Sequence, residues 1–156
     1  MRRRWRILLA GTILAAAALA VALDGADRSA TAGAGPPGSE TRRVPVDGGG
    51  AYIDVNAVGL ATMLRTKAFP LVNVHIPYEG EIEGTDLFIP FDQIEAHLDK
   101  LPADKGAQVV LYCRSGHMSA VAARDLVKRG YTNVLNLDGG MIAWTQAGYP
   151  LVHRRR

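Results

Sequence analysis

Residues 109–120 read VVLYCRSGHMSA, and most of what the sequence says about the fold starts from this pattern. The apolar run 109–112 is bounded by small residues, which predicts a buried strand of a parallel sheet. A short loop of small and polar residues follows, and Ser119 suits the N-cap of the next helix. Cys113, the only cysteine of the chain, is the first residue of that loop.

A thiol at this position faces loop N–H groups and a helix N-terminus. Both stabilise negative charge, so both favour the thiolate over the thiol. Because the thiolate is the nucleophilic form, we expect Cys113 to be reactive. The alternative is a small buried residue without chemistry, which is the common state of a free cysteine.

Strand and helix patterns alternate on both sides of this segment. We predict strands at 52–55, 71–74, 108–112 and 134–137, and helices at 58–67, 91–100, 119–129 and 141–147. Repeated βα units predict an α/β domain in which a small parallel sheet has helices on both faces. Ligands of such sheets bind at the carboxyl ends of the strands, which is where Cys113 lies.

The N-terminus has the pattern of an export signal. Four arginines within residues 2–6 precede the uncharged, Ala- and Leu-rich run 7–23. The run is long enough that an uncleaved membrane anchor is the alternative to a cleaved signal peptide. In both cases we expect the rest of the chain to be exported to the periplasm or another extracytoplasmic space. It would then be soluble after cleavage, or anchored by residues 7–23.

Three further segments complete the predicted organisation. Residues 24–43 are rich in Gly, Pro and Ala and are expected to be a flexible linker. The folded domain is expected at 44–152, followed by a basic tail at 153–156.

Charge is distributed unevenly along the 156 residues. The net charge of +3 depends on seven arginines at the two ends: Arg2, Arg3, Arg4, Arg6, Arg154, Arg155 and Arg156. Without them, 11 basic residues face 15 acidic ones, so the body of the chain is near −4. It has no basic, aromatic-rich stripe, and we therefore expect no nucleic-acid partner. Membrane contact is expected only through the N-terminal segment.

Two stretches give the chain its resemblance to a known family. Residues 112–119 read YCRSGHMS, and residues 137–144 read LDGGMIAW, with AGYP following at 147–150. In these stretches the domain resembles the rhodanese-like family, specifically its single-domain sulfurtransferases. The resemblance implies a rhodanese-like fold and sulfur transfer through a persulfide on Cys113. The donor would be thiosulfate or a similar small anion, and the acceptor a thiol or a cyanide-like group.

The resemblance also implies a binding loop around Cys113. In the family, a six-residue loop turns its amides toward the cysteine, and here that loop is 113–118, with Ser119 opening the helix. These amides would hold a persulfide or the sulfonate end of thiosulfate. The substrate-binding candidates are Arg114, Ser115, Gly116, His117, Met118 and Ser119.

Several of these residues have a second interpretation. Arg114 attracts an anionic donor or is a solvated surface residue. His117 stabilises a thiolate, or is an exposed loop histidine without a catalytic role. Ser115 and Ser119 donate hydrogen bonds to the sulfur, or they cap the loop and the helix. Gly139 and Gly140 are expected to form a tight turn of structural importance.

The chain departs from the family pattern after the strand at 71–74. The family commonly has Asp-x-Arg there, whereas this chain has Asn73-Val74-His75. The change leaves the preference for thiosulfate open. The acidic run 78–86 is a solvated loop or a docking surface for a basic partner.

Two other functions follow from the same residues. A cysteine phosphatase needs an arginine six positions after the cysteine, and Ser119 stands there, which disfavours it. A non-enzymatic sulfur-relay or binding module with a dedicated envelope partner is the main alternative to an enzyme.

A thiol-reducing protein partner is expected because an exported Cys113 is exposed to oxidation. No cofactor is predicted, and the sequence has neither C-x-x-C nor H-E-x-x-H, which disfavours a metal site.

Overall fold

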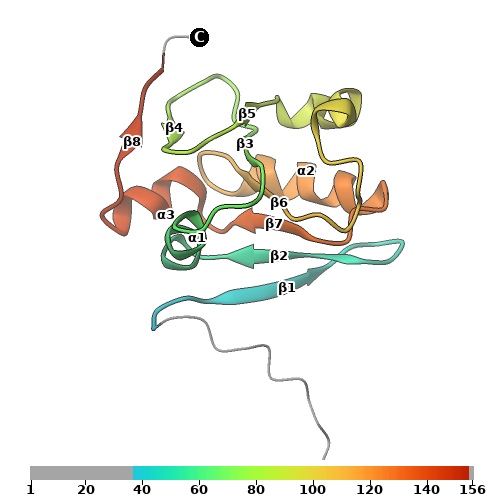
Figure 1. Ribbon diagram of the computed structural model, residues 1–156, viewed down its shortest axis with the longest axis horizontal. Coiled ribbons are helices and arrows are strands. Elements are labelled where there is room, and N and C mark those ends of the chain that lie inside the picture. The colour runs from blue at the N-terminus through green and yellow to red at the C-terminus, as the bar shows by residue number, and fades with distance from the viewer. Residues whose placement is uncertain (1–36, 155–156) are drawn as a thin grey trace, which may run out of the picture. The chain divides into compact units, whose positions relative to one another are not determined.

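The computed structural model describes residues 37–154, in which strands and helices alternate along the chain (Figure 1). The elements are β1 (Thr41–Pro45), β2 (Ala51–Val55), α1 (Ala57–Leu64), β3 (Leu71–Asn73), β4 (Glu81–Ile82), β5 (Leu87–Phe88), the 3₁₀-helix η1 (Phe91–Lys100), β6 (Val109–Tyr112), α2 (His117–Lys128), β7 (Val134–Leu137), α3 (Gly140–Gln146) and β8 (Leu151–Val152).

The main sheet places β6 near its centre. Its strand order is β1-β2-β7-β6-β3-β5, and Figure 1 shows β1, β2, β7 and β6 following one another across the molecule. Five of these strands pair in parallel, namely β2, β7, β6, β3 and β5. The edge strand β1 pairs antiparallel with β2. The carboxyl end of β6 therefore lies between those of β7 and β3. The predicted α/β class is confirmed.

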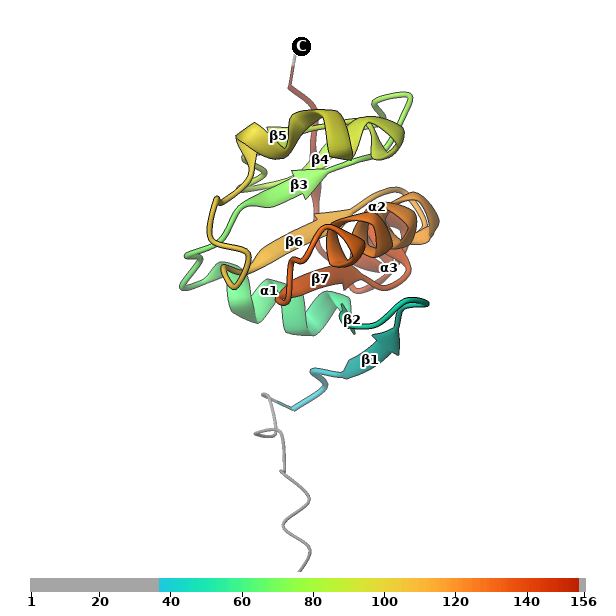
Figure 2. The same cartoon turned by 90° about the vertical axis from the view of Figure 1, so that its right-hand side faces the viewer.

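The core has two halves, one on each face of the sheet. Alternate residues of a strand point to opposite faces, and along β6 Val109 and Leu111 pack with α2 while Val110 and Tyr112 pack on the face of α1 and α3. Figure 2 shows α1 and α2 on opposite sides of the strands. This double burial explains why β6 reads as an unbroken apolar run.

The folded part begins earlier than the sequence pattern indicated. β1 starts at Thr41, inside the expected linker 24–43, and pairs along its whole length with β2. Its side chains are mostly exposed, and Arg42 forms an ion pair with Asp54. Because this edge strand buries little apolar surface, it has no hydrophobic pattern by which it could be recognised.

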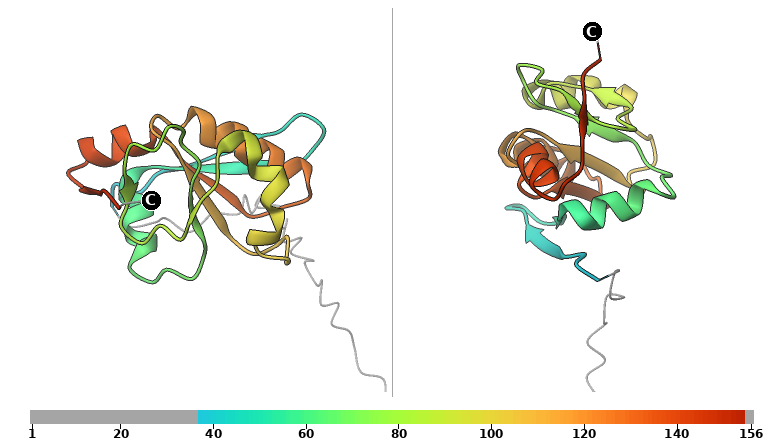
Figure 3. Two further views of the ribbon diagram at one scale, coloured as in Figure 1. Left: turned by 90° about the horizontal axis from the view of Figure 1, so that it is seen from above. Right: turned by 90° about the vertical axis from the view of Figure 1, so that its left-hand side faces the viewer.

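The start of the predicted basic tail is also part of the fold. β8 pairs antiparallel with β4, and Figure 3 shows β8 running past that segment. Arg154 lies two residues beyond β8, with Nε 2.9 Å from Oε1 of the fully buried Glu81. The acidic run thus binds a basic residue of its own chain, a pairing that the sequence pattern does not indicate.

Two helices differ from their predicted form. Residues 91–100 are a 3₁₀-helix with a kink at His97, and only Ile94 is fully buried among them. Helix α2 begins at His117 rather than at Ser119.

The predicted signal peptide or anchor, residues 1–23, lies outside the described residues, as does most of the expected linker. Among residues 37–154, no helix combines the length and the apolar character required to cross a membrane.

Candidate active site

Cys113 lies directly after β6 and is only 1% exposed. Its Sγ accepts a hydrogen bond from the backbone N–H of Gly116 at 3.1 Å and lies 3.4 Å from the hydroxyl oxygen of Ser119. This burial fits a small core residue without chemistry. The two hydrogen-bond donors fit a reactive thiol instead. They are directed at sulfur, where they stabilise a negative charge.

The turn from Cys113 into α2 depends on Gly116. This residue is the N-cap of α2 and has a φ of +86°, a left-handed conformation that favours glycine. The helix consequently starts at His117, and Ser119 lies in its first turn, so the prediction that Ser119 is the N-cap is wrong. Its hydroxyl lies 3.2 Å from the Gly116 carbonyl oxygen and can donate to that oxygen or to Sγ.

Helix α3 supports the loop from its other side. The N–H of Met141 donates to the carbonyl oxygen of Cys113 at 2.9 Å, and the N–H of Ile142 donates to that of Arg114 at 3.0 Å. Gly140 makes this approach possible, because a Cβ there would overlap the Cys113 carbonyl oxygen and lie 2.7 Å from the carbonyl carbon of Arg114. The tight turn at Gly139-Gly140 is therefore structural, as predicted, and its contact with the cysteine loop explains the need for glycine.

The remaining loop residues differ in exposure. Arg114, Ser115 and His117 are exposed, and Met118 is half-buried. The structure thus brings Gly116 and Ser119 to the sulfur and leaves the three exposed side chains at the surface beside it.

Glu79 joins this surface and was not singled out from the sequence. One of its carboxylate oxygens is 3.2 Å from Nε of Arg114 and 3.3 Å from Nε2 of His75. The distance to His75 suits an ion pair when the imidazole is protonated, but neither ring nitrogen has hydrogen-bond geometry to a partner among the described residues. The sequence showed only an acidic run, and nothing in it distinguished Glu79 from Glu81 or Glu83.

Asn73 explains part of the departure from Asp-x-Arg. It is fully buried at the end of β3, its amide nitrogen donates to the Gly80 carbonyl oxygen at 2.9 Å, and its amide oxygen accepts from the His75 N–H at 3.0 Å. An aspartate has no amide donor for Gly80. Asn73 therefore ties residues 75–80 to the sheet.

Tyr112, next to Cys113 and paired with Asn73 across β6 and β3, ties the following segment to the same face of the sheet. Its hydroxyl accepts from the Ile82 N–H at 3.0 Å and lies 2.7 Å from the Thr85 hydroxyl. Because the Thr85 hydroxyl donates to the Ile82 carbonyl, that of Tyr112 donates to Thr85. Burial raises the pKa of Tyr112 to about 12, so its phenol is neutral at physiological pH.

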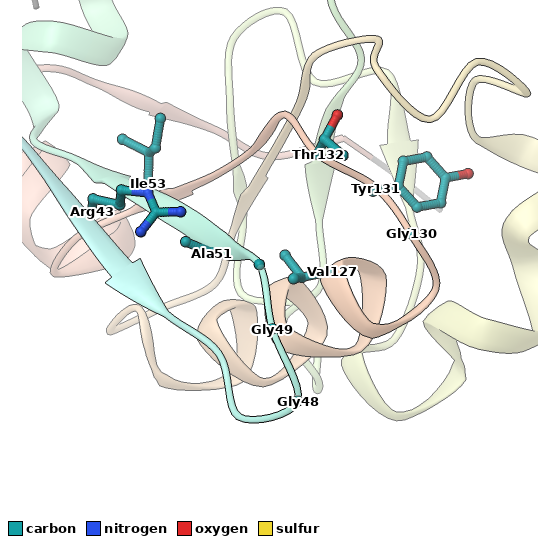
Figure 4. Close-up of a pocket in the computed structure, with 10 residues that line it drawn as sticks. Arg43, Gly48, Gly49, Ala51, Ile53, Val127, Gly130, Tyr131 and Thr132 are labelled. Carbon is teal, nitrogen blue, oxygen red and sulfur yellow. The ribbon is translucent and has the colours of Figure 1, made fainter. Parts of the chain in front are cut away.

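The pocket beside the cysteine loop is small. It measures about 120 Å³ and is lined by Glu79, Arg114, Met141, Ile142, Thr145 and Leu151. A larger pocket of about 530 Å³ lies elsewhere, framed by the β1–β2 turn and the end of α2 (Figure 4). It contains none of the residues around Cys113. Among the described residues, no three His, Cys, Asp or Glu side chains are grouped to hold a metal ion.

Comparisons with known proteins agree with this geometry. The model of the rhodanese-like domain matches residues 71–147. A protein named sulfurtransferase from Allochromatium vinosum is 41% identical over 90 residues, which cover 56% of this chain and 81% of that protein. Thiosulfate sulfurtransferase 18 of Arabidopsis thaliana is 30% identical over 108 residues, covering 66% and 72%. In other relatives the match covers a smaller part of the relative's own length. It covers 52% of the Synechocystis protein slr1261 and 22% of the probable adenylyltransferase/sulfurtransferase MoeZ of Mycobacterium tuberculosis.

Solved structures show the same architecture. The crystal structure of a rhodanese-related protein from Thermoplasma volcanium matches with a TM-score of 0.54 and 27% identity. The match covers 64% of this chain and 96% of that protein.

Proposed function

The chain belongs to the rhodanese-like family of sulfurtransferases, and from that premise we propose that it transfers a sulfane sulfur through a persulfide on Cys113. The donor is thiosulfate or a similar small anion, and the acceptor is a thiol or a cyanide-like group. The proposal rests chiefly on the position of the Cys113 sulfur, which lies at the carboxyl end of a central parallel strand within reach of two hydrogen-bond donors.

The reaction has two balanced steps. In the first, the Cys113 thiolate attacks the outer sulfur of thiosulfate, and a new S–S bond forms. The S–S bond of thiosulfate breaks, and its electron pair leaves with sulfite. In the second, a nucleophilic acceptor such as cyanide attacks the terminal sulfur of the persulfide. Thiocyanate leaves, and the Cys113 thiolate is regenerated.

The surroundings of the sulfur suit both steps. The thiolate and the persulfide anion each carry negative charge, which the Gly116 N–H and the Ser119 hydroxyl can stabilise. The dipole of α2, whose first residue is His117, acts in the same direction. The hydrogen bonds from α3 hold the backbone of the loop in place, so little reorganisation is needed as charge moves between sulfur atoms.

The proposal is tested by turnover with thiosulfate and cyanide. The wild-type protein is expected to form thiocyanate catalytically, and Cys113→Ser is expected to form none above the uncatalysed rate. Cys113→Ser with full activity would refute the role of Cys113.

We also propose that the protein is exported and works in the periplasm or a comparable space with a thiol protein as partner. The arginine-led apolar run at residues 2–23 supports the export. Cell fractionation tests it: the protein is expected with the envelope, and recovery with the cytoplasm alone would contradict it.

A further inference from the structure

We propose that Glu79 is a specificity-determining residue that selects against doubly charged sulfur donors at the Cys113 site. The inference rests on the proposed function of Cys113 and adds the class of donor. Glu79 neutralises Arg114, so the site binds thiosulfate, a dianion, less tightly than a sulfane donor that carries one negative charge, although both donate sulfur.

Glu79 is held in place by its backbone. The residue after it, Gly80, accepts the hydrogen bond from the buried amide of Asn73. Gly80 has a φ of +112°, and a Cβ on it would lie 3.1 Å from the imidazole of His153. The segment is thus fixed between the end of β3 and the C-terminal residues, which directs the Glu79 carboxylate at the loop of Cys113.

The charges around the loop then cancel. Arg114 carries the only permanent charge among residues 113–119. Its Nε is 3.2 Å from the Glu79 carboxylate. Of the other carboxylates in the acidic run 78–86, Glu81 and Glu83 face Arg154, and Asp86 pairs with Lys67. Arg114 is therefore the permanently charged group that Glu79 neutralises, and the His75 imidazole is a second neighbour of the same carboxylate oxygen at 3.3 Å. An incoming dianion meets this carboxylate beside the guanidinium.

The pair has little value for stability. The side chains of Arg114 and Glu79 are 59% and 42% exposed, and ion pairs between such groups add little to the free energy of unfolding. Removing the charge of Glu79 therefore leaves the fold intact and uncovers the positive charge of Arg114. For a dianion a few ångströms away in a partly aqueous site, we expect the KM to fall about three- to tenfold.

The experiment compares Glu79→Gln with wild type for two donors of different charge, thiosulfate and benzenethiosulfonate. Glu83→Gln is the matched control, because it removes the same charge from the same segment at a side chain that faces Arg154. We expect Glu79→Gln to lower the KM for thiosulfate about three- to tenfold, with a smaller effect for benzenethiosulfonate and a change in KM larger than that in kcat. Glu83→Gln is expected to behave as wild type.

Ionic strength separates an electrostatic effect from a structural one. The KM of Glu79→Gln for thiosulfate is expected to rise with salt more steeply than that of wild type, because an exposed charge is screened. Equal KM values for wild type, Glu79→Gln and Glu83→Gln would overturn the role of Glu79 while leaving sulfur transfer in place. If no variant transfers sulfur from either donor, the proposed function and the inference both fail.

Discussion

The Cys113 sulfur is buried, yet its nearest hydrogen-bond donors are polar groups of the loop and of α2. A buried thiolate without such donors would be costly, because burial disfavours charge. The Gly116 N–H is fixed by the backbone, whereas the Ser119 hydroxyl can rotate between sulfur and the Gly116 carbonyl. Ser119 is therefore the side chain that can respond when charge develops on sulfur.

The first prediction concerns Ser119. Ser119→Ala removes one charge-assisted hydrogen bond to sulfur, and we expect alkylation of Cys113 by iodoacetamide at neutral pH to slow about three- to tenfold. Ser115→Ala is the matched control, since Ser115 is an exposed serine of the same loop. Equal alkylation rates for both variants would contradict a role of Ser119 in stabilising the thiolate.

The second prediction concerns Asn73. Asn73→Asp puts a carboxylate beside the Gly80 carbonyl oxygen in a fully buried position, so the lost donor and the buried charge both destabilise the fold. We expect a loss of about 1–3 kcal/mol in the free energy of unfolding, measured with urea at neutral pH. Asn133→Asp, at a half-buried asparagine before β7, is the control. A loss no larger than that of the control would show that the Asn73 amide is dispensable.

At the scale of elements, α3 and the cysteine loop act as one unit. The N–H groups of Met141 and Ile142 bind the loop carbonyls only because Gly140 brings the two backbones together. A change in α3 should therefore affect the chemistry at Cys113 although α3 contributes no group to the sulfur itself.

The third prediction tests this coupling with Gly140→Ala. The added methyl group overlaps the Cys113 carbonyl, so we expect a loss of about 2 kcal/mol or more in stability and a marked fall in sulfur transfer. Gly148→Ala is the control: its φ of +86° imposes a similar left-handed strain, but no atom lies within 4 Å of the added Cβ. If both variants lose the same stability and activity, strain alone explains the effect and the contact with the loop does not.

The fourth prediction concerns Tyr112, which ties β6 to the segment 82–85. Burial disfavours its phenolate, so its pKa is about 12 in the folded protein against about 10 when unfolded, and the free energy of unfolding falls as the pH rises from about 10 toward 12. The shift corresponds to roughly 2–3 kcal/mol. Tyr112→Phe has no phenol to ionise, so its free energy of unfolding should fall less steeply over that range. If the free energy of unfolding had the same pH dependence in both proteins, a raised pKa of Tyr112 would be contradicted.

For the whole molecule, the sequence predicted what periodicity and local chemistry encode. The strands around β6 and the helices on both faces follow from apolar runs and 3.6-residue spacing, and Cys113 follows from its place after a buried strand. The edge strand β1 buries too little to leave a pattern. The pairing of Glu79 with Arg114 and of Glu81 with Arg154 joins residues distant in sequence, so composition showed an acidic run but not its partners.

The described part of the molecule is a sheet that presents the Cys113 sulfur at its carboxyl edge, with Glu79 and the start of α3 in contact with the loop that carries it. Persulfide formation on Cys113 is tested most directly by the intact mass of the full chain before and after treatment with thiosulfate, and again after cyanide. The wild type is expected to gain one sulfur atom that disappears with cyanide, and Cys113→Ser is expected to gain none. An unchanged mass in the wild type, or the same gain in Cys113→Ser, would contradict it.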